Sequence, residues 1–165
     1  MNSQQTYIAL ETIVTKEIRR FTRIWVQTLL PPAITMCLYF VIFGNIVGSR
    51  VGQMGGFDYM QYIAPGLIMM SVITNSYSNV VSSFYGAKFQ RNIEELVVSP
   101  VPHYIILSGF VIGGVVRGLL VGVMVTLLSL FFTHLSIHHL FVVIYSVLIT
   151  STLFALGGFV NAVFA

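Results

Sequence analysis

The chain has 165 residues, of which 56% are hydrophobic and 8% are charged. A soluble domain typically carries about 25% charged residues, so too few polar side chains are present to cover a core in water. This excludes an ordinary soluble enzyme or nucleic-acid-binding module, despite a net charge of +3. The single cysteine, Cys37, excludes a disulfide framework and a cysteine-rich zinc site. The composition therefore predicts an all-α integral membrane protein.

Residues 1–25 are predicted to form an amphipathic helix that lies in the headgroup plane of a membrane. Apolar residues recur at steps of three and four on one narrow face: Tyr7, Leu10, Val14, Ile18, Phe21 and Trp25. The opposite face carries polar and basic side chains: Thr12, Lys16, Arg19, Arg20 and Arg23. An apolar stripe with basic residues on the opposite face is typical of an interfacial helix. The alternative is a solvated segment whose charges only set the orientation of the protein.

Long uncharged segments predict the membrane spans, and they cover residues 24–49, 59–87 and 118–165. A spanning helix needs about 20 apolar residues, so the first two segments each fit one span. The third is too long for one span, and polar residues at 134–139 divide it. Four transmembrane helices are therefore predicted within a domain covering 26–165, near residues 26–48, 60–86, 108–132 and 140–165. The last span ends without a basic anchor, so we expect the chain to be a fragment of a longer protein.

Two local features modify the first span. Pro31 and Pro32 lie early in it and are expected to kink the helix or to unwind its hydrogen-bond ladder locally. The glycine-rich segment 48–59 that follows is expected to be a flexible turn on the outer side.

The distribution of lysine and arginine predicts the orientation. The N-terminal segment and the 87–104 loop together hold most of the basic residues: Lys16, Arg19, Arg20, Arg23, Lys88 and Arg91. The 49–58 loop holds only Arg50, and the 133–139 loop holds none. Basic residues in short loops remain on the cytoplasmic side. The N-terminus and the 87–104 loop are therefore predicted to face the cytoplasm.

The second predicted span is the most polar. Its hydroxyl and amide side chains fall on one side of the helical wheel: Ser71, Thr74, Asn75, Ser78, Asn79 and Ser82, with Ser76 and Ser83 beside them. Because lipid penalises such a face, we expect it to meet protein or a water-filled path. Interhelical hydrogen bonding without a transport role is an equal alternative.

The third predicted span combines small residues with one charge. Glycines recur at four-residue spacing and predict close packing of another helix: Gly109 and Gly113, then Gly114, Gly118 and Gly122. Arg117 is the only charged residue in any predicted span. The simpler interpretation is that its side chain snorkels toward the headgroups. A buried partner or a contact with an anionic substrate is the alternative.

The sequence contains no motif for nucleotide binding or acid–base catalysis. A P-loop requires Gly-x-x-x-x-Gly-Lys-Ser/Thr, whereas Lys16 and Lys88 follow threonine and alanine. ATP would therefore have to bind to another chain. No predicted span contains an acidic residue, which disfavours a proton-coupled carrier.

One histidine cluster resembles a metal-binding sequence. His134, His138 and His139 share a short segment, but only His103 remains elsewhere. Because a metal site first requires enough ligands, an ordinary polar turn is the preferred interpretation. A membrane metalloenzyme remains a distant alternative, and no metal, cofactor or catalytic residue is assigned to this chain.

Residues 87–104 form the most informative soluble segment. Apolar residues keep helical spacing among charged neighbours: Phe89, Ile93, Leu96 and Val97. Ser99-Pro100 ends the pattern, because the residue before a proline avoids the α region. A short amphipathic helix from Phe89 to Val97 is predicted, in a position where a partner could push it. A simple connector with an exposed charged face is the alternative.

At these residues the sequence resembles the ABC-2 family of transporter permeases, the membrane subunits of ATP-driven exporters. The resemblance rests on Tyr62-Ile-Ala-Pro-Gly-Leu67, on Arg91-Asn-Ile-Glu-Glu-Leu-Val-Val-Ser-Pro100, and on Arg117. It extends along essentially the whole chain. It implies a bacterial inner-membrane permease with six spans and an N-terminal interfacial helix. Such a permease is expected to pair with a second, identical permease copy and with cytoplasmic ATPase subunits that hold ATP and Mg²⁺.

The resemblance also assigns roles to residues. The 87–104 loop would couple to the ATPase through Lys88, Arg91, Glu94, Glu95, Ser99 and Pro100. The second span and Arg117 would line the translocation path or the dimer seam, through Ser71, Asn75, Ser78, Asn79, Ser82 and Arg117. Membrane lipids are the other expected partner, and nucleic acid is not. A self-contained small carrier or channel without an ATPase is the alternative function.

Overall fold

The computed structural model describes residues 3–133 and 139–164, apart from the side chains of residues 3, 45 and 54. In chain order its elements are α1 (Ser3–Arg23), α2 (Trp25–Val41), a π-helix (Ile42–Val47), α3 (Gly48–Val51), β1 (Gln53–Met54), β2 (Phe57–Asp58), α4 (Tyr59–Phe89), α5 (Asn92–Val98), α6 (His103–Ser129) and α7 (Leu140–Phe164). The predicted all-α class is confirmed, apart from the short β1–β2 hairpin.

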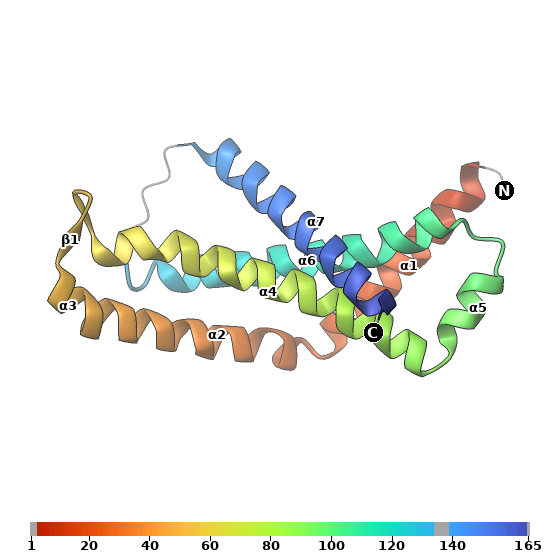
Figure 1. The fold of residues 1–165 in the computed structure, drawn as a ribbon, viewed down its shortest axis with the longest axis horizontal. Helices are drawn as coiled ribbons and strands as arrows, with labels where there is room; N and C mark the ends of the chain where they lie inside the picture. Colours follow the sequence, from red (N-terminus) through yellow and green to blue (C-terminus); the bar gives the residue numbers. More distant parts are fainter. Residues whose placement is uncertain (1–2, 134–138, 165) are drawn as a thin grey trace.

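The long helices form an elongated bundle in which α2, α4 and α6 follow the long axis, while α7 crosses them obliquely (Figure 1). Helix α4 packs mainly against α6 and α7, and α1 packs against α6. The β1–β2 hairpin lies at one end of the bundle, and α1 and α5 lie toward the other end (Figure 1). The N-terminal helix and the 87–104 loop therefore share one end, as the distribution of basic residues requires.

Among the described residues, three helices are long and apolar enough to cross a membrane: Trp25–Val51, His103–Ser129 and Leu140–Phe164. They match the first, third and fourth predicted spans. The second predicted span lies within α4, which has 31 residues and at about 1.5 Å per residue is also long enough. Its serines and asparagines lower its hydropathy, so the second predicted span stays a prediction.

The chain breaks between α1 and α2 rather than at the proline pair. Ile24 has φ −116° and ψ 42°, outside the helical region, whereas α2 runs through Pro31 and Pro32 without interruption. The expected unwinding at these prolines is therefore wrong. Thr28 stabilises the break, because its hydroxyl donates to the carbonyl oxygens of Phe21 at 3.2 Å and of Ile24 at 3.1 Å. The Phe21 carbonyl oxygen lies in the last turn of α1, where intrahelical donors are missing, whereas the Ile24 carbonyl oxygen also accepts from the backbone N–H of Thr28 at 3.0 Å.

Segment 48–59, expected to be a turn, contains the short helix α3 and the β1–β2 hairpin. β1 and β2 pair antiparallel, with Met54 opposite Phe57. Gly55 and Gly56 connect them with φ values of 61° and 84°. Two consecutive positive φ angles are the requirement of a tight hairpin turn and favour glycine at both positions.

Helix α1 buries a different face from the predicted stripe. Ile13, Glu17 and Phe21 are buried, whereas Tyr7 and Trp25 are exposed. Of the predicted apolar stripe, Phe21 is buried, and Leu10 packs at the edge of the core. The reason lies in α6, where glycines leave room for Ile13 and Glu17 to approach its backbone.

The glycines of α6 form two packing surfaces. Gly109 and Gly113 face Ile13 and Glu17 of α1, whereas the second row faces Val72, Ser76 and Val80 of α4: Gly114, Gly118 and Gly122. A Cβ atom at any of these positions would overlap the facing helix. The predicted packing role of these glycines is therefore confirmed. Close backbone approach of this kind strengthens helix association where no hydrophobic driving force acts between helices.

Gly157 and Gly158 of α7 offer a matched test of this packing. A Cβ atom on Gly158 would lie 2.8 Å from the carbonyl oxygen of Tyr77, whereas one on Gly157 would meet nothing within 4 Å. We expect Gly158→Ala to destabilise the protein by about 1–3 kcal/mol through overpacking. Gly157→Ala should be neutral or stabilising, because alanine favours a helix over glycine. Thermal unfolding of both variants in detergent, followed by circular dichroism, measures the difference, and equal midpoints would contradict the packing.

Candidate functional site

A buried carboxylate ties α1 to the transmembrane helices. Glu17 is 2% exposed, and Ser83 Oγ of α4 lies 2.7 Å from both of its carboxylate oxygens and donates to them. Arg20, one turn further along α1, donates to Glu17 Oε2 at 3.3 Å and forms an ion pair with it. A buried charge requires this kind of pairing and hydrogen bonding to persist in a packed interior.

Asn79 joins this pair to α6. Arg20 Nη2 donates to Asn79 Oδ1 at 2.8 Å and to the Asn79 carbonyl oxygen at 3.2 Å. Arg117 Nη1 of α6 donates to the same Oδ1 at 3.2 Å. One amide oxygen therefore accepts from two guanidinium groups on different helices. We call Glu17, Arg20, Asn79, Ser83 and Arg117 the polar cluster.

The polar cluster contains more positive than negative charge. Glu17 is its only carboxylate, and Arg20 and Arg117 are both cationic. Within the described residues, the only salt bridge joins Arg20 to Glu17, so Arg117 has no carboxylate partner there. Three N–H groups of the cluster are buried without a hydrogen-bond acceptor in the described protein: Arg20 Nε, Asn79 Nδ2 and Arg117 Nε. The cluster is therefore rich in unpaired donors.

The structure separates the residues of the predicted polar stripe into two groups. Ser71, Asn75 and Asn79 are buried, whereas Ser78 and Ser82 are exposed. The helical wheel does not explain this separation, because residues three, four and seven apart share one face of a helix, so it depends on which neighbouring helix covers each position. Asn75 Nδ2 bonds the carbonyl oxygen of Ser71 at 3.0 Å, and only Asn79 bonds Arg117.

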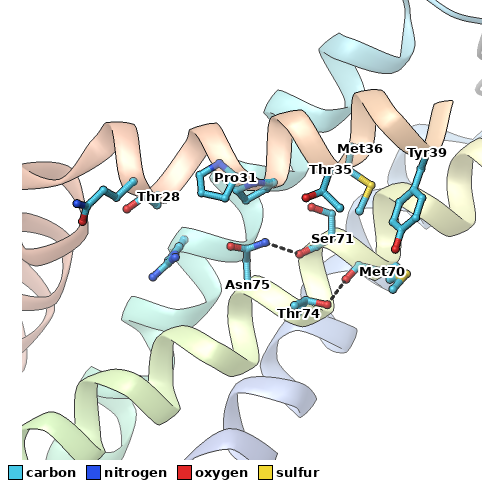
Figure 2. Close-up of a pocket in the computed structure, with 12 residues that line it drawn as sticks. Thr28, Pro31, Thr35, Met36, Tyr39, Met70, Ser71, Thr74 and Asn75 are labelled. Carbon is cyan, nitrogen blue, oxygen red and sulfur yellow. Dashed lines mark hydrogen bonds between the residues drawn. The ribbon is translucent and has the colours of Figure 1, made fainter. Parts of the chain in front are cut away.

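A cavity of about 300 Å³ lies between α2 and α4 beside the polar cluster, with Arg117 of α6 among its lining residues (Figure 2). Its buried lining consists of Thr28, Met36, Ser71 and Asn75. Its exposed lining consists of Gln27, Pro31, Thr35, Met70 and Thr74. Figure 2 shows the side chains of Thr35 and Ser71 projecting from α2 and α4 toward each other. The cavity thus has a polar interior and a mouth on the outside of the bundle.

The sequence pointed to Asn75, Asn79 and Arg117 as candidate site residues. It did not indicate that Glu17 and Arg20 belong to the same polar cluster as Asn79 and Arg117. Arg20 was placed on the exposed basic face, and Glu17 was assigned no role. A weak signal existed, since Glu17 lies four residues from both Ile13 and Phe21, the spacing of one helix face. The expected snorkelling of Arg117 is replaced by a hydrogen bond to Asn79 inside the bundle.

The 87–104 loop differs from the predicted helix in its boundaries. Helix α4 continues to Phe89, and α5 begins only at Asn92, so one predicted helix from Phe89 to Val97 is wrong. Arg91 causes the break with φ 59° and ψ 7°, a left-handed conformation. Its carbonyl oxygen accepts from the backbone N–H of Glu94 at 3.2 Å. The turn therefore directs α5 away from α4 at the end of the bundle (Figure 1).

The predicted coupling residues lie on both sides of this turn. Lys88, Arg91, Glu94, Glu95 and Pro100 are exposed, and Ser99 is half-buried. Ser99 Oγ donates to the Leu96 carbonyl oxygen at 2.6 Å and closes the last turn of α5. Lys88 Nζ donates to the carbonyl oxygen of Val163 in α7 at 3.3 Å. The structure therefore gathers five of the six predicted side chains at an accessible surface.

The predicted histidine cluster falls mostly outside the described residues, because His134 and His138 lie in the segment 134–138. Across residues 3–133 and 139–164, no group of three or more histidine, cysteine or acidic residues could hold a metal ion.

The role of Glu17 can be tested against Glu11, an exposed acidic residue on the same helix. Glu17→Ala leaves Arg20 without its carboxylate partner and Ser83 without its acceptor. We expect it to destabilise the docking of α1 by about 1–3 kcal/mol, whereas Glu11→Ala should have little effect. Limited trypsin digestion in detergent measures the exposure of Lys16, Arg19 and Arg23. Equal digestion rates for both variants would show that Glu17 does not hold α1.

The conformation of Arg91 predicts which substitutions the turn tolerates. Glycine adopts a left-handed conformation readily, whereas a β-branched residue does not. Arg91→Gly should keep the turn, and Arg91→Val should disfavour it by about 1–2 kcal/mol. Hydrogen exchange of the amides of α5 measures the difference. Both variants remove the same charge, so faster exchange in Arg91→Gly than in Arg91→Val would contradict the assigned conformation.

Comparisons with known proteins agree with this architecture. Residues 8–165 match the family described as ABC-2 type transporter. The chain is 62% identical over 159 residues to proteins named inner membrane transport permease YadH from Escherichia coli (strain K12) and Shigella flexneri. These matches cover 96% of this chain and 62% of each relative, so the chain spans 62% of the length of those curated relatives. No solved structure matches it. The chain belongs to the ABC-2 type transporter family.

Proposed function

We propose that this chain is the membrane-spanning part of an ATP-driven exporter and couples to a separate ATPase through the 87–104 loop. The observation that carries the proposal is the position of α5, which projects at one end of the bundle with both of its acidic side chains exposed (Figure 1). Family membership supports a transport role. The chain itself performs no catalysis in this proposal, and ATP and Mg²⁺ bind to the partner.

The surface around α5 has the properties of a contact site. Glu94 and Glu95 lie in the first turn of α5, and Phe89 and Val98 are 80% and 86% exposed beside them. Apolar groups next to acidic ones suit a partner surface with a hydrophobic pocket and a basic rim. Because Arg91 sets the turn and Lys88 contacts α7, a push on α5 would reach both α4 and α7.

The same proposal assigns α4 to the translocation path or the seam with a second permease copy. The exposed residues Thr74, Ser78 and Ser82 follow one another at four-residue spacing and form a polar row on the outside of the bundle. Lipid is a poor environment for such a row. A second copy, most simply an identical one, would cover it. The N-terminus and the 87–104 loop then face the cytoplasm of a bacterium, on the side of the basic residues.

The coupling role is tested by reversing the charge of Glu95. We expect Glu95→Arg, and to a lesser degree Glu95→Ala, to weaken binding of a P-loop ATPase by at least about tenfold, because a repulsive contact replaces an attractive one. The measurement is co-purification from the native host in mild detergent, with a tagged chromosomal copy, read by quantitative mass spectrometry.

Asp58→Arg is the matched control, because it makes the same charge reversal on an exposed residue at the hairpin end of the bundle. It should leave ATPase recovery unchanged, and all variants should insert into the membrane at the wild-type level. Equal ATPase recovery with wild-type, Glu95→Ala and Glu95→Arg would refute the coupling assignment. Absence of any ATPase from the wild-type sample would favour the self-contained carrier instead.

A further inference from the structure

We propose that the cavity between α2 and α4 is a binding site for an amphipathic anion, a single phosphate or carboxylate headgroup attached to an apolar chain, with Arg117 as the residue that contacts the headgroup. This inference rests on the proposed transport function and deepens it. It goes further by assigning a class of ligand and a recognition residue.

The first argument is the charge of Arg117. In the described residues this guanidinium hydrogen-bonds only Asn79, and the only salt bridge is that of Arg20 with Glu17. No acidic residue occurs in segments 24–49, 59–87 or 118–165, so the helices around the cavity cannot supply a counter-charge. A cation inside a membrane bundle is costly without a compensating charge. An anion in the cavity would provide it.

The second argument is the set of unpaired polar atoms. Arg117 Nε is a buried donor without an acceptor, and Ser71 Oγ is a buried hydroxyl without a partner. Both residues line the cavity. Buried polar groups in proteins are almost always hydrogen-bonded, and charged donors make the stronger bonds to anionic oxygens. A phosphate or carboxylate in the cavity would give the guanidinium of Arg117 an anionic acceptor.

The third argument is the shape and polarity of the cavity. Its volume of about 300 Å³ suits a headgroup with a short length of chain, at the lower end of small-molecule sites. The mouth contains Pro31 and Met70 and opens on the outside of the bundle. Beside the mouth, an exposed apolar row follows α2 at four-residue spacing: Leu30, Ile34 and Leu38. The chain of the ligand would lie along this row.

The lining also argues against other ligand classes. None of its residues is acidic, so an organic cation would meet Arg117 without an opposing carboxylate. A neutral ligand would leave the charge of Arg117 uncompensated. An anion without an apolar part would use the polar interior but not Met36, Met70 or the apolar row of α2.

The test is direct binding of radiolabelled decyl phosphate to the purified protein in phosphatidylcholine nanodiscs, with empty nanodiscs as background. We expect saturable binding at one site. Arg117→Gln should weaken it by at least about tenfold, because one charge-assisted contact is lost. Arg117→Lys should weaken it less, since the positive charge remains. Arg19→Gln, on the exposed face of α1, should leave the affinity unchanged.

A steric variant keeps the test valid if loss of Arg117 perturbs the polar cluster. Thr35 is exposed at the mouth and is not a member of the polar cluster, so Thr35→Trp should block the cavity while the bundle stays folded. Unchanged affinity in both Arg117→Gln and Thr35→Trp would overturn the proposal. So would competition by inorganic phosphate as effective as that of unlabelled decyl phosphate, since the apolar chain would then contribute nothing. Equal competition by decyltrimethylammonium would overturn the requirement for an anion.

This experiment contains no ATPase and is independent of the Glu95 test. Binding that depends on Arg117, together with no ATPase in the co-purification, would leave the anion site intact and refute the exporter. ATPase binding that depends on Glu95, together with unchanged decyl phosphate binding in Arg117→Gln, would support the exporter and refute the anion site.

Discussion

The buried carboxylate of Glu17 is the interaction on which the end of the bundle that contains α1 depends. A carboxylate in a packed apolar bundle persists only where charge and hydrogen bonds compensate it, and Arg20 and Ser83 provide both. Asn79 then extends the same network to Arg117. One network therefore fixes α1 against α4 and α6, so an N-terminal helix that could have lain freely on the membrane becomes part of the bundle.

The glycines of α6 make that network possible. Gly113 admits Glu17, and Gly118 admits Ser76, so the α1–α6 and α4–α6 pairs approach closely on two different faces. Helix α2 lies outside this tightly packed group, and the cavity forms where it diverges from α4 (Figure 2). Rigid packing around α6 and a cavity beside α2 thus arise from the same distribution of small side chains. In the proposed transport cycle, α5 would act on α4, which borders both regions.

Several features of the candidate site followed from sequence reasoning and others did not. The polar character of α4 and the position of Arg117 as a lone charge in its span were predictable from the sequence, because charged and amide side chains are rare in apolar helices. The division of the polar stripe into buried Asn75 and Asn79 and exposed Ser78 and Ser82 was not readable. A helical wheel gives the relative angles of side chains, but the neighbour that covers each angle depends on how helices assemble.

The sequence by itself determined the membrane class, the family, the approximate limits of the long helices and the packing role of the glycines. These depend on local composition and on the 3.6-residue period, which act within one helix. Only the tertiary structure decided that Glu17 is buried, that Asn79 accepts from both Arg20 and Arg117, and that the chain breaks at Ile24 and Arg91. Those outcomes depend on contacts between helices distant in the chain, where the energy of compensating a charge or filling a glycine groove outweighs local preference.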